Sequence, residues 1–178
     1  QYTELDADIL LLLQNNNTIV LIINSNHINP VGEERAFIHA LMNKNYNTPV
    51  VIHQNYQENN PENLQVKAGA DFGALLLAGF GDGILITNKG DLKTTEIDNY
   101  SFSILQAARV RTSKTEYISC PSCGRTLFDL QTTIAEIKKA TSHLKHLKIG
   151  IMGCIVNGPG EMADADYGYV GAERGKIT

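Results

Sequence analysis

Short apolar runs rich in β-branched residues alternate with longer segments along the first 110 residues of the chain. Residues 18–23, 49–53 and 83–87 each have the length and composition of a buried strand. The segments between them have about a dozen residues or more, which is the length that a crossover between parallel strands requires. The alternation therefore predicts an α/β fold with a parallel sheet. It fits part of a (β/α)8 barrel or of a doubly wound sheet, and the pattern alone does not choose.

Helix signals occupy the predicted crossovers. Asn29 is a good N-cap with Pro30 at the first helical position, and residues 62–77 and 97–110 are predicted as the next two helices. Residues 6–13 fit either a short helix or a buried strand. The side chains expected to face the core are Phe37, Ile38, Leu41 and Met42 in the first helix, and Phe102, Ile104, Leu105 and Ala108 in the last.

The pattern changes at residues 110–115, a polar connector that follows Arg109 and contains Arg111 and Lys114. Beyond it we expect a strand at 115–119, a helix from Asp129 to about Leu144, and strands at 146–152 and 166–170. We therefore predict two domains, residues 1–112 and residues 113–178. Because the chain begins without a methionine and stops soon after a glycine-rich turn, we expect it to be a segment of a longer protein.

Composition argues against two classes of partner. Fifteen Lys and Arg against nineteen Asp and Glu give a net charge of −4 without a run of like charges, so no broad footprint for nucleic acid is present. The longest apolar run, residues 9–13, is far shorter than the roughly 20 residues that cross a bilayer. We expect a soluble cytoplasmic protein that binds neither nucleic acid nor membrane.

All three cysteines lie in one stretch that ends at Glu161. Cys120 and Cys123 form a C-x2-C pair after a predicted strand, and Cys154 follows the next one, between Gly153 and a loop with two more glycines. Buried or weakly redox-active thiols are one interpretation. A thioredoxin-like disulfide leaves Cys154 unexplained, and a closed zinc site needs four ligands, for which His143 and His146 are badly placed. A [4Fe–4S] cluster with three thiolates and a carboxylate as the fourth ligand fits better.

Two exact strings carry a resemblance. Residues 119–129 read SCPSCGRTLFD and residues 151–161 read IMGCIVNGPGE. Together they closely resemble the C-terminal domain of the 4-hydroxy-3-methylbut-2-enyl diphosphate synthase family. The resemblance implies a [4Fe–4S] cluster on Cys120, Cys123, Cys154 and Glu161, with Asn157 beside its open side. It also implies an α+β, ferredoxin-like (nitrite/sulfite-reductase-like) domain that continues beyond residue 178.

The activity of that family is the expectation for the parent protein. It is the reductive opening of 2-C-methyl-D-erythritol 2,4-cyclodiphosphate to 4-hydroxy-3-methylbut-2-enyl diphosphate in isoprenoid synthesis, with ferredoxin or flavodoxin as the electron donor. Glu161 would leave its iron when substrate binds, and Asn157 would either hydrogen-bond to the departing oxygen or cap the glycine-rich turn. Arg125 either supports the cluster loop or pairs with Asp129.

The resemblance extends more faintly to residues 75–87, which look like the last turn of the family's TIM barrel. Where that barrel grips phosphate with Arg-x-Ser, this chain has Leu85-Ile86-Thr87. Residues 1–112 thus resemble the C-terminal part of the degenerate, barrel-like insert of three-domain members. The catalytic barrel would lie upstream, the full-length protein would be a homodimer, and this piece would be inactive alone.

Alternatives stay open for both halves. Residues 1–110 could form an independent α/β binding module that uses His27, His39 and His53, although each is the kind of residue that also occurs as a satisfied structural histidine. The cysteines could belong to a non-catalytic iron–sulfur or zinc-binding scaffold that docks to a partner. Arg109, Arg111 and Lys114 could bind an anionic substrate or form a solvated linker.

Overall fold

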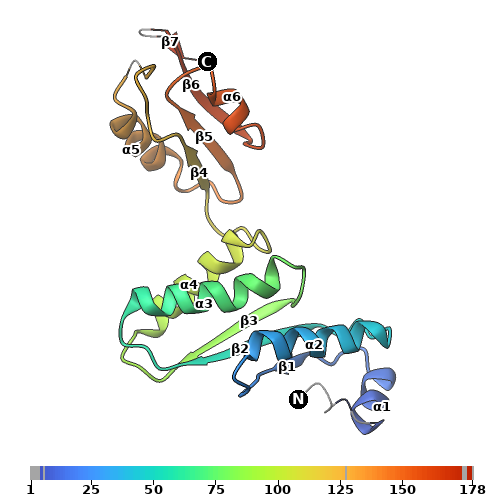
Figure 1. Cartoon of the computed structure of the whole chain (residues 1–178). Helices are drawn as coiled ribbons and strands as arrows, with labels where there is room; N and C mark the ends of the chain where they lie inside the picture. The colour runs from blue at the N-terminus through green and yellow to red at the C-terminus, as the bar shows by residue number, and fades with distance from the viewer. Residues whose placement is uncertain (1–4, 6, 127, 174–175, 178) are drawn as a thin grey trace. The chain divides into compact units, whose positions relative to one another are not determined.

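The computed structural model describes residues 5, 7–126, 128–173 and 176–177. The chain divides into two compact units, Gln1–Arg111 and Thr112–Thr178 (Figure 1). Each unit has its own sheet.

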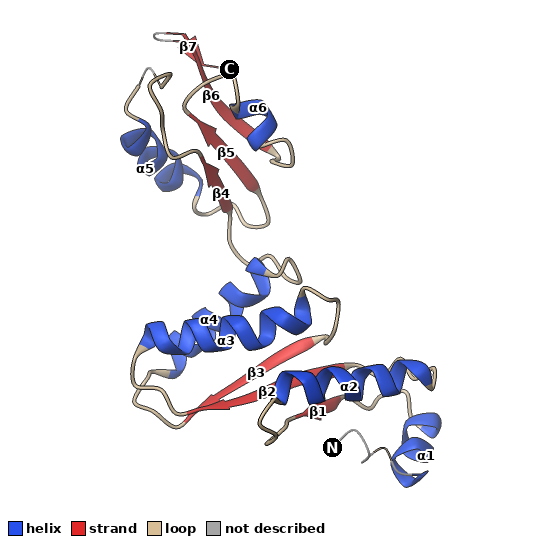
Figure 2. Cartoon of the chain, in the orientation of Figure 1, coloured by secondary structure: helices blue, strands red, loops and turns tan. Residues whose placement is uncertain are grey.

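Unit 1 alternates strands with helices, as its sequence predicts (Figure 2). Its elements are α1 (Ala7–Asn15), β1 (Leu21–Ile23), α2 (Pro30–Asn43), β2 (Val50–Tyr56), α3 (Pro61–Leu76), β3 (Gly83–Asn88) and α4 (Thr94–Ala107). The three strands lie in the order β1-β2-β3, and both pairs are parallel. The predicted parallel α/β sheet is therefore confirmed, and residues 7–15 adopt the helical one of the two predicted conformations.

The core of unit 1 lies on one face of its sheet, under α2, α3 and α4 (Figure 2). Ile52 of β2 is fully buried and belongs to the same core cluster as Leu64 and Phe72 of α3. Side chains alternate between the two faces of a strand, so the opposite face carries Ile22 and Leu85, which are 62% and 39% exposed. The described residues of unit 1 thus cover one face of the sheet and leave Ile22 and Leu85 exposed on the other, although parallel sheets are ordinarily buried on both faces.

Several local predictions for unit 1 need correction. Met42 and Phe102 were expected in the core but are 55% and 37% exposed. The Phe102 ring instead lies 5.3 Å from the guanidinium carbon of Arg111. The last helix spans Thr94–Ala107 rather than residues 97–110. It ends early because Arg109 takes a left-handed conformation with φ of 58°, and the N–H of Val110 turns back to the Leu105 carbonyl.

Unit 2 contains a four-stranded sheet in the order β4-β5-β6-β7. Its elements are β4 (Glu116–Ser119), α5 (Leu130–Thr141), β5 (Lys148–Met152), α6 (Gly158–Glu161), β6 (Tyr167–Glu173) and β7 (Lys176–Ile177). The first three strands are parallel, and β7 pairs antiparallel with β6. The predicted strands and helix are present, but the described residues do not confirm a ferredoxin-like α+β arrangement, because three of the four strands are parallel.

Helix α5 packs on the sheet through Leu130, Ile134 and Ile137, next to the buried Ile149 and Ile151 of β5. It begins where Asp129 accepts hydrogen bonds from the N–H and hydroxyl of Thr132. It ends at Thr141, three residues earlier than predicted.

Candidate functional site

The carboxyl ends of β4 and β5 bring Cys120 and Cys154 together. The two strands are parallel neighbours, with Ser119 opposite Ile151. Cys120 directly follows β4, and Cys154 follows β5 after Gly153. The N–H of Gly153 donates a hydrogen bond to the Cys120 sulfur, with an N···Sγ distance of 3.2 Å. Ligands of α/β sheets commonly bind at this edge, outside the carboxyl ends of the strands.

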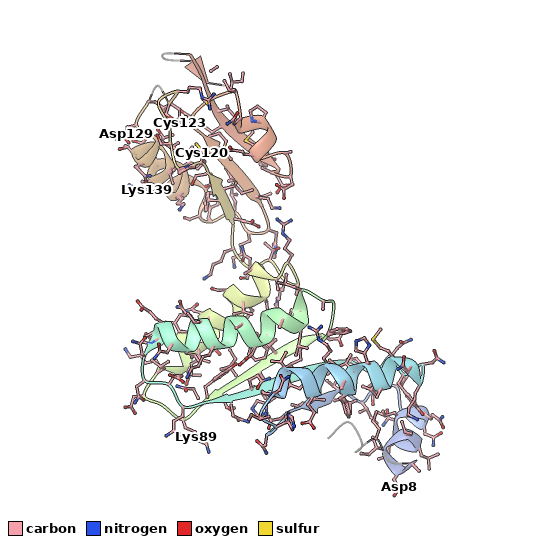
Figure 3. The ribbon with its side chains drawn as sticks, in the orientation of Figure 1. Asp8, Lys89, Cys120, Cys123, Asp129 and Lys139 are labelled. Atoms are coloured by element: carbon pink, nitrogen blue, oxygen red, sulfur yellow. The ribbon has the colours of Figure 1, made fainter. Side chains whose placement is uncertain are left out.

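The loop after β4 returns Cys123 to the same place, and Figure 3 shows Cys120 and Cys123 close together there. Ser122 has a positive φ of 75°, an uncommon conformation for a residue other than glycine. The turn closes through a hydrogen bond from the Thr126 N–H to the Cys123 carbonyl, 2.9 Å long. The Cys123 N–H in turn donates to the Thr126 hydroxyl, at 3.4 Å. This turn directs a largely exposed loop toward Cys154.

These residues surround a cavity of about 210 Å³. Its lining consists of Cys120, Pro121, Ser122, Cys123, Arg125, Met152, Cys154, Asn157, Gly158 and Glu161. The cavity therefore contains every residue that the sequence predicts as a ligand or catalytic group. All three thiols are free, with Cys120 and Cys154 half-buried and Cys123 exposed.

Arg125 is the cation of the cavity. Its backbone N–H and then its guanidinium hold the pKa of the Cys123 thiol below the usual value, with a smaller contribution from a hydrogen bond to Cys154. The thiolate is the form of cysteine that binds metals. Arg125 thus interacts with Cys123, and its role there stays a prediction. Asp129 instead serves as the N-cap of α5, and its bonds to Thr132 lower the pKa of its carboxyl group.

Glu161 reaches the cavity from the short helix α6, on the chain that leaves β5. The Glu161 N–H donates to the Asn157 carbonyl, at 3.0 Å, and the Gly158 N–H donates to the Cys154 carbonyl, at 3.2 Å. Asn157 occupies the N-cap position, but its side chain makes no capping hydrogen bond within the described turn. Asn157 is one of the residues that line the cavity, and the structure does not support the capping role considered for it.

The donor set tests which inorganic group the cavity suits. In the part of the chain that the structure describes, no three His, Cys, Asp or Glu side chains converge as the ligands of a single ion would. A structural zinc site needs four ligands close around one centre. A [4Fe–4S] cube takes one ligand per iron and so distributes its ligands around a larger body. Three thiols and a carboxylate line the cavity, which is the number of donors that a cube with one ligand per iron requires.

The histidines of unit 1 have structural partners. His53 Nε2 lies 3.1 Å from the Thr87 hydroxyl, and the ring of His39 packs edge-on against Phe80. His27 Nδ1 accepts a hydrogen bond from the Asn29 N–H, at 3.1 Å. These contacts favour satisfied structural histidines over a second functional site.

Sequence reasoning missed the residues that hold the cavity in shape. A Cβ placed on Gly153 would collide with the Thr126 side chain, and one on Gly158 would lie 2.8 Å from the Met152 Cβ. Both glycines are therefore required for close packing, whereas the sequence suggests only that glycines make the loop adaptable. Only the pairing of distant segments reveals these contacts.

Unit 2 is thus a small α/β domain with a thiol-lined cavity at the carboxyl edge of its sheet. Residues 116–178 match the family model described as the GcpE protein C-terminal domain. No helix in the described ranges is long and apolar enough to cross a membrane.

The whole chain is also similar to longer proteins named 4-hydroxy-3-methylbut-2-en-1-yl diphosphate synthase. The flavodoxin-type protein of Phocaeicola vulgatus is 60% identical over 177 residues, which cover 99% of this chain and 29% of that protein. The flavodoxin-type protein of Porphyromonas gingivalis is 55% identical, over 98% of this chain and 30% of its own length. The chloroplastic, ferredoxin-type protein of Oryza sativa subsp. japonica is 50% identical, over 85% of this chain and 21% of its own length. The chain therefore spans under a third of the length of each of these relatives.

Proposed function

We propose that this chain is the cluster-carrying part of a 4-hydroxy-3-methylbut-2-en-1-yl diphosphate synthase. In this proposal Cys120, Cys123, Cys154 and Glu161 hold a [4Fe–4S] cluster. The observation that carries the proposal is that these four residues, from three separate segments, line one cavity of about 210 Å³. The similarity to synthases across nearly the whole chain supports it.

The protein groups around the cavity have distinct proposed tasks. Arg125 favours the thiolate of Cys123, and the Gly153 N–H donates to the Cys120 sulfur, as hydrogen bonds to cluster ligands do when they adjust a reduction potential. When bound, the cluster supplies single electrons and one iron open to a substrate oxygen. In this proposal Glu161 would be an oxygen ligand that can yield its place, and Asn157, which lines the same cavity, would donate a hydrogen bond from its side-chain amide to that oxygen.

The substrate in this proposal is 2-C-methyl-D-erythritol 2,4-cyclodiphosphate, which is opened by two electrons with loss of water. Flavodoxin or ferredoxin is the proposed donor, because the names of the relatives specify these carriers. The diphosphate would be bound mainly by a domain outside the 178 residues, so turnover requires the longer protein. A cytoplasmic location and a homodimer belong to the same proposal.

Unit 1 is proposed as the end of a barrel-like domain without a phosphate site. Its strands are parallel, its helices lie on one face, and Ile22 and Leu85 are exposed on the other. In a (β/α)8 barrel the helices surround the strands and the inner face is filled by side chains from all strands. Further strands of a longer chain would cover the exposed apolar residues in this way.

Anaerobic reconstitution with iron and sulfide tests the cluster assignment. We expect about four irons and four sulfides per chain, with visible absorption and, after reduction, an EPR signal. Cys120→Ser, Cys123→Ser and Cys154→Ser should each abolish stable assembly, whereas Ser142→Ala, at the exposed end of α5, should not. Stoichiometric binding of one zinc ion without sulfide would instead support the scaffold alternative.

A further inference from the structure

Met162 follows the candidate ligand Glu161 directly and packs on the sheet where two glycines face each other. Gly150 of β5 and Gly168 of β6 are partners in the parallel register. A Cβ on Gly150 would lie 2.6 Å from the Met162 sulfur and 2.7 Å from the Met162 Cβ. A Cβ on Gly168 would lie 2.9 Å from the sulfur and would overlap the terminal methyl group. The missing side chains thus form a notch that the Met162 side chain fills.

The notch fixes one end of α6, and a second close contact fixes the other. Gly158 begins the helix against Met152 and Val170, where a Cβ would lie 2.8 and 3.2 Å from their side chains. The Met162 N–H also donates to the Gly158 carbonyl, at 3.1 Å. Glu161 therefore lies on a single helical turn whose two ends both pack against β5 and β6.

We propose that Met162 is a positioning residue, and that its packing between Gly150 and Gly168 sets where the Glu161 carboxylate stands relative to the three cysteines. This inference rests on the proposed cluster function. A ligand that must hold an iron and later release it needs a defined resting position, and supporting contacts of this kind commonly change metal retention when they are lost.

The two glycines make different predictions because a Cβ on either would meet the Met162 sulfur, but only one on Gly150 would also meet the Met162 Cβ. A methyl group on Gly168 meets the flexible end of the side chain, so Gly168→Ala and Met162→Ala should compensate each other. A methyl group on Gly150 meets the Met162 Cβ, which alanine retains. Met162→Ala should therefore not rescue Gly150→Ala, because the turn itself must move.

The test reconstitutes the full 178-residue chain and measures how fast one iron is lost under limited oxidation, detected as the EPR signal of a three-iron cluster. Glu161→Ala provides the reference for a cluster without its fourth ligand. We expect Met162→Ala, Gly168→Ala and Gly150→Ala to retain the fourth iron roughly 10-fold to 100-fold less well than the unsubstituted chain. The Gly168→Ala/Met162→Ala double variant should approach the unsubstituted chain more closely than either single variant.

Gly160→Ala is the matched control, since it adds a methyl group to the same helical turn with nothing within 4 Å. It should retain iron as the unsubstituted chain does. A second readout needs no cluster: hydrogen exchange of the Glu161 amide should accelerate in Met162→Ala and not in Gly160→Ala. Because this measurement compares Met162→Ala with Gly160→Ala, it still tests the inference if Gly150→Ala or Gly168→Ala fails to fold.

Two results would overturn the inference. One is unchanged iron retention and unchanged Glu161 exchange in Met162→Ala. The other is a double variant with Gly168→Ala that is no better than its parents. The failure of the proposed function looks different, since the unsubstituted chain would then assemble no cube, or would lose iron at the rate of Glu161→Ala.

Discussion

Glu34 gives unit 1 a stability that should depend on pH. Its side chain in α2 is 2% exposed, and Gln54 Nε2 donates to both carboxylate oxygens, at 3.0 and 2.7 Å. Burial, and then the nearby charge of Asp71, raise the pKa of Glu34 from its usual 4.5 to about 7, although the bonds from Gln54 oppose the shift. Tyr56 donates to the Asp71 carboxylate, at 2.8 Å, and completes the group.

The direction of the effect follows from proton binding. Between pH 4.5 and about 7 the folded protein holds a proton on Glu34 that the unfolded chain has released, so stability falls as the pH rises through this window. The favourable contribution is complete below pH 4.5 and is lost above about pH 7. The raised pKa corresponds to about 3 kcal/mol in the free energy of unfolding, as an upper limit.

Glu34→Gln removes the titrating group and keeps its shape. Relative to the unsubstituted chain, the variant should gain stability between pH 5 and about pH 7, by up to about 3 kcal/mol, and the gain should level off by pH 8. Urea unfolding followed through the NMR amide signals of Ile52 and Gln54 in β2 reports on unit 1 alone. Asp98→Asn, an exposed acid in α4, is the control and should show no such trend.

The decisive quantity is the difference in unfolding free energy between Glu34→Gln and the unsubstituted chain, plotted against pH. A difference that stays constant within about 0.5 kcal/mol from pH 5 to pH 8 would refute the reasoning, since surface substitutions alone stay within that range. A Glu34→Gln variant that loses stability relative to the unsubstituted chain as the pH rises would also refute the reasoning.

Three further predictions concern unit 1 and are measured as changes in the free energy of urea unfolding. Gly79→Ala and Gly81→Ala both place alanine at positive φ and should each lose about 1–2 kcal/mol. Gly81→Ala should lose about 1–3 kcal/mol more, because its Cβ would press on the Ile52 side chain whereas Gly79 faces open space; equal losses would contradict this. Phe72→Ala should lose about 3–5 kcal/mol from the fully buried core, and a loss under about 1 kcal/mol would place Phe72 elsewhere. Asn60→Ala should lose about 1 kcal/mol, because the Asn60 side chain accepts from two N–H groups at the start of α3; an unchanged midpoint would show that this cap is not formed in solution.

Local sequence signals predicted the elements well where the physical cause is itself local. Asn29 and Asp129 begin α2 and α5 as N-caps, and the apolar runs become the strands of two parallel sheets. The ends of helices were less predictable. Helix α4 stops because Arg109 adopts a positive φ, and no residue in that segment signals such a conformation.

Burial was predicted less well than secondary structure. Phe102 has the character and spacing of a core residue, yet its ring lies beside Arg111 at the surface. Periodicity identifies which side chains share a face of a helix, but the neighbouring elements decide how far that face is covered. Here the neighbouring elements leave the Phe102 side chain partly exposed.

The sequence by itself determined which donors the candidate site offers, because Cys120, Cys123, Cys154 and Glu161 supply three thiols and a carboxylate within two specific motifs. The tertiary structure alone decided that these donors share a cavity. Two parallel strands must be neighbours before Cys120 and Cys154 can meet, and strand pairing depends on contacts between residues far apart in the chain. The Met162 notch has the same origin, since Gly150 and Gly168 form a gap only when their strands lie in register.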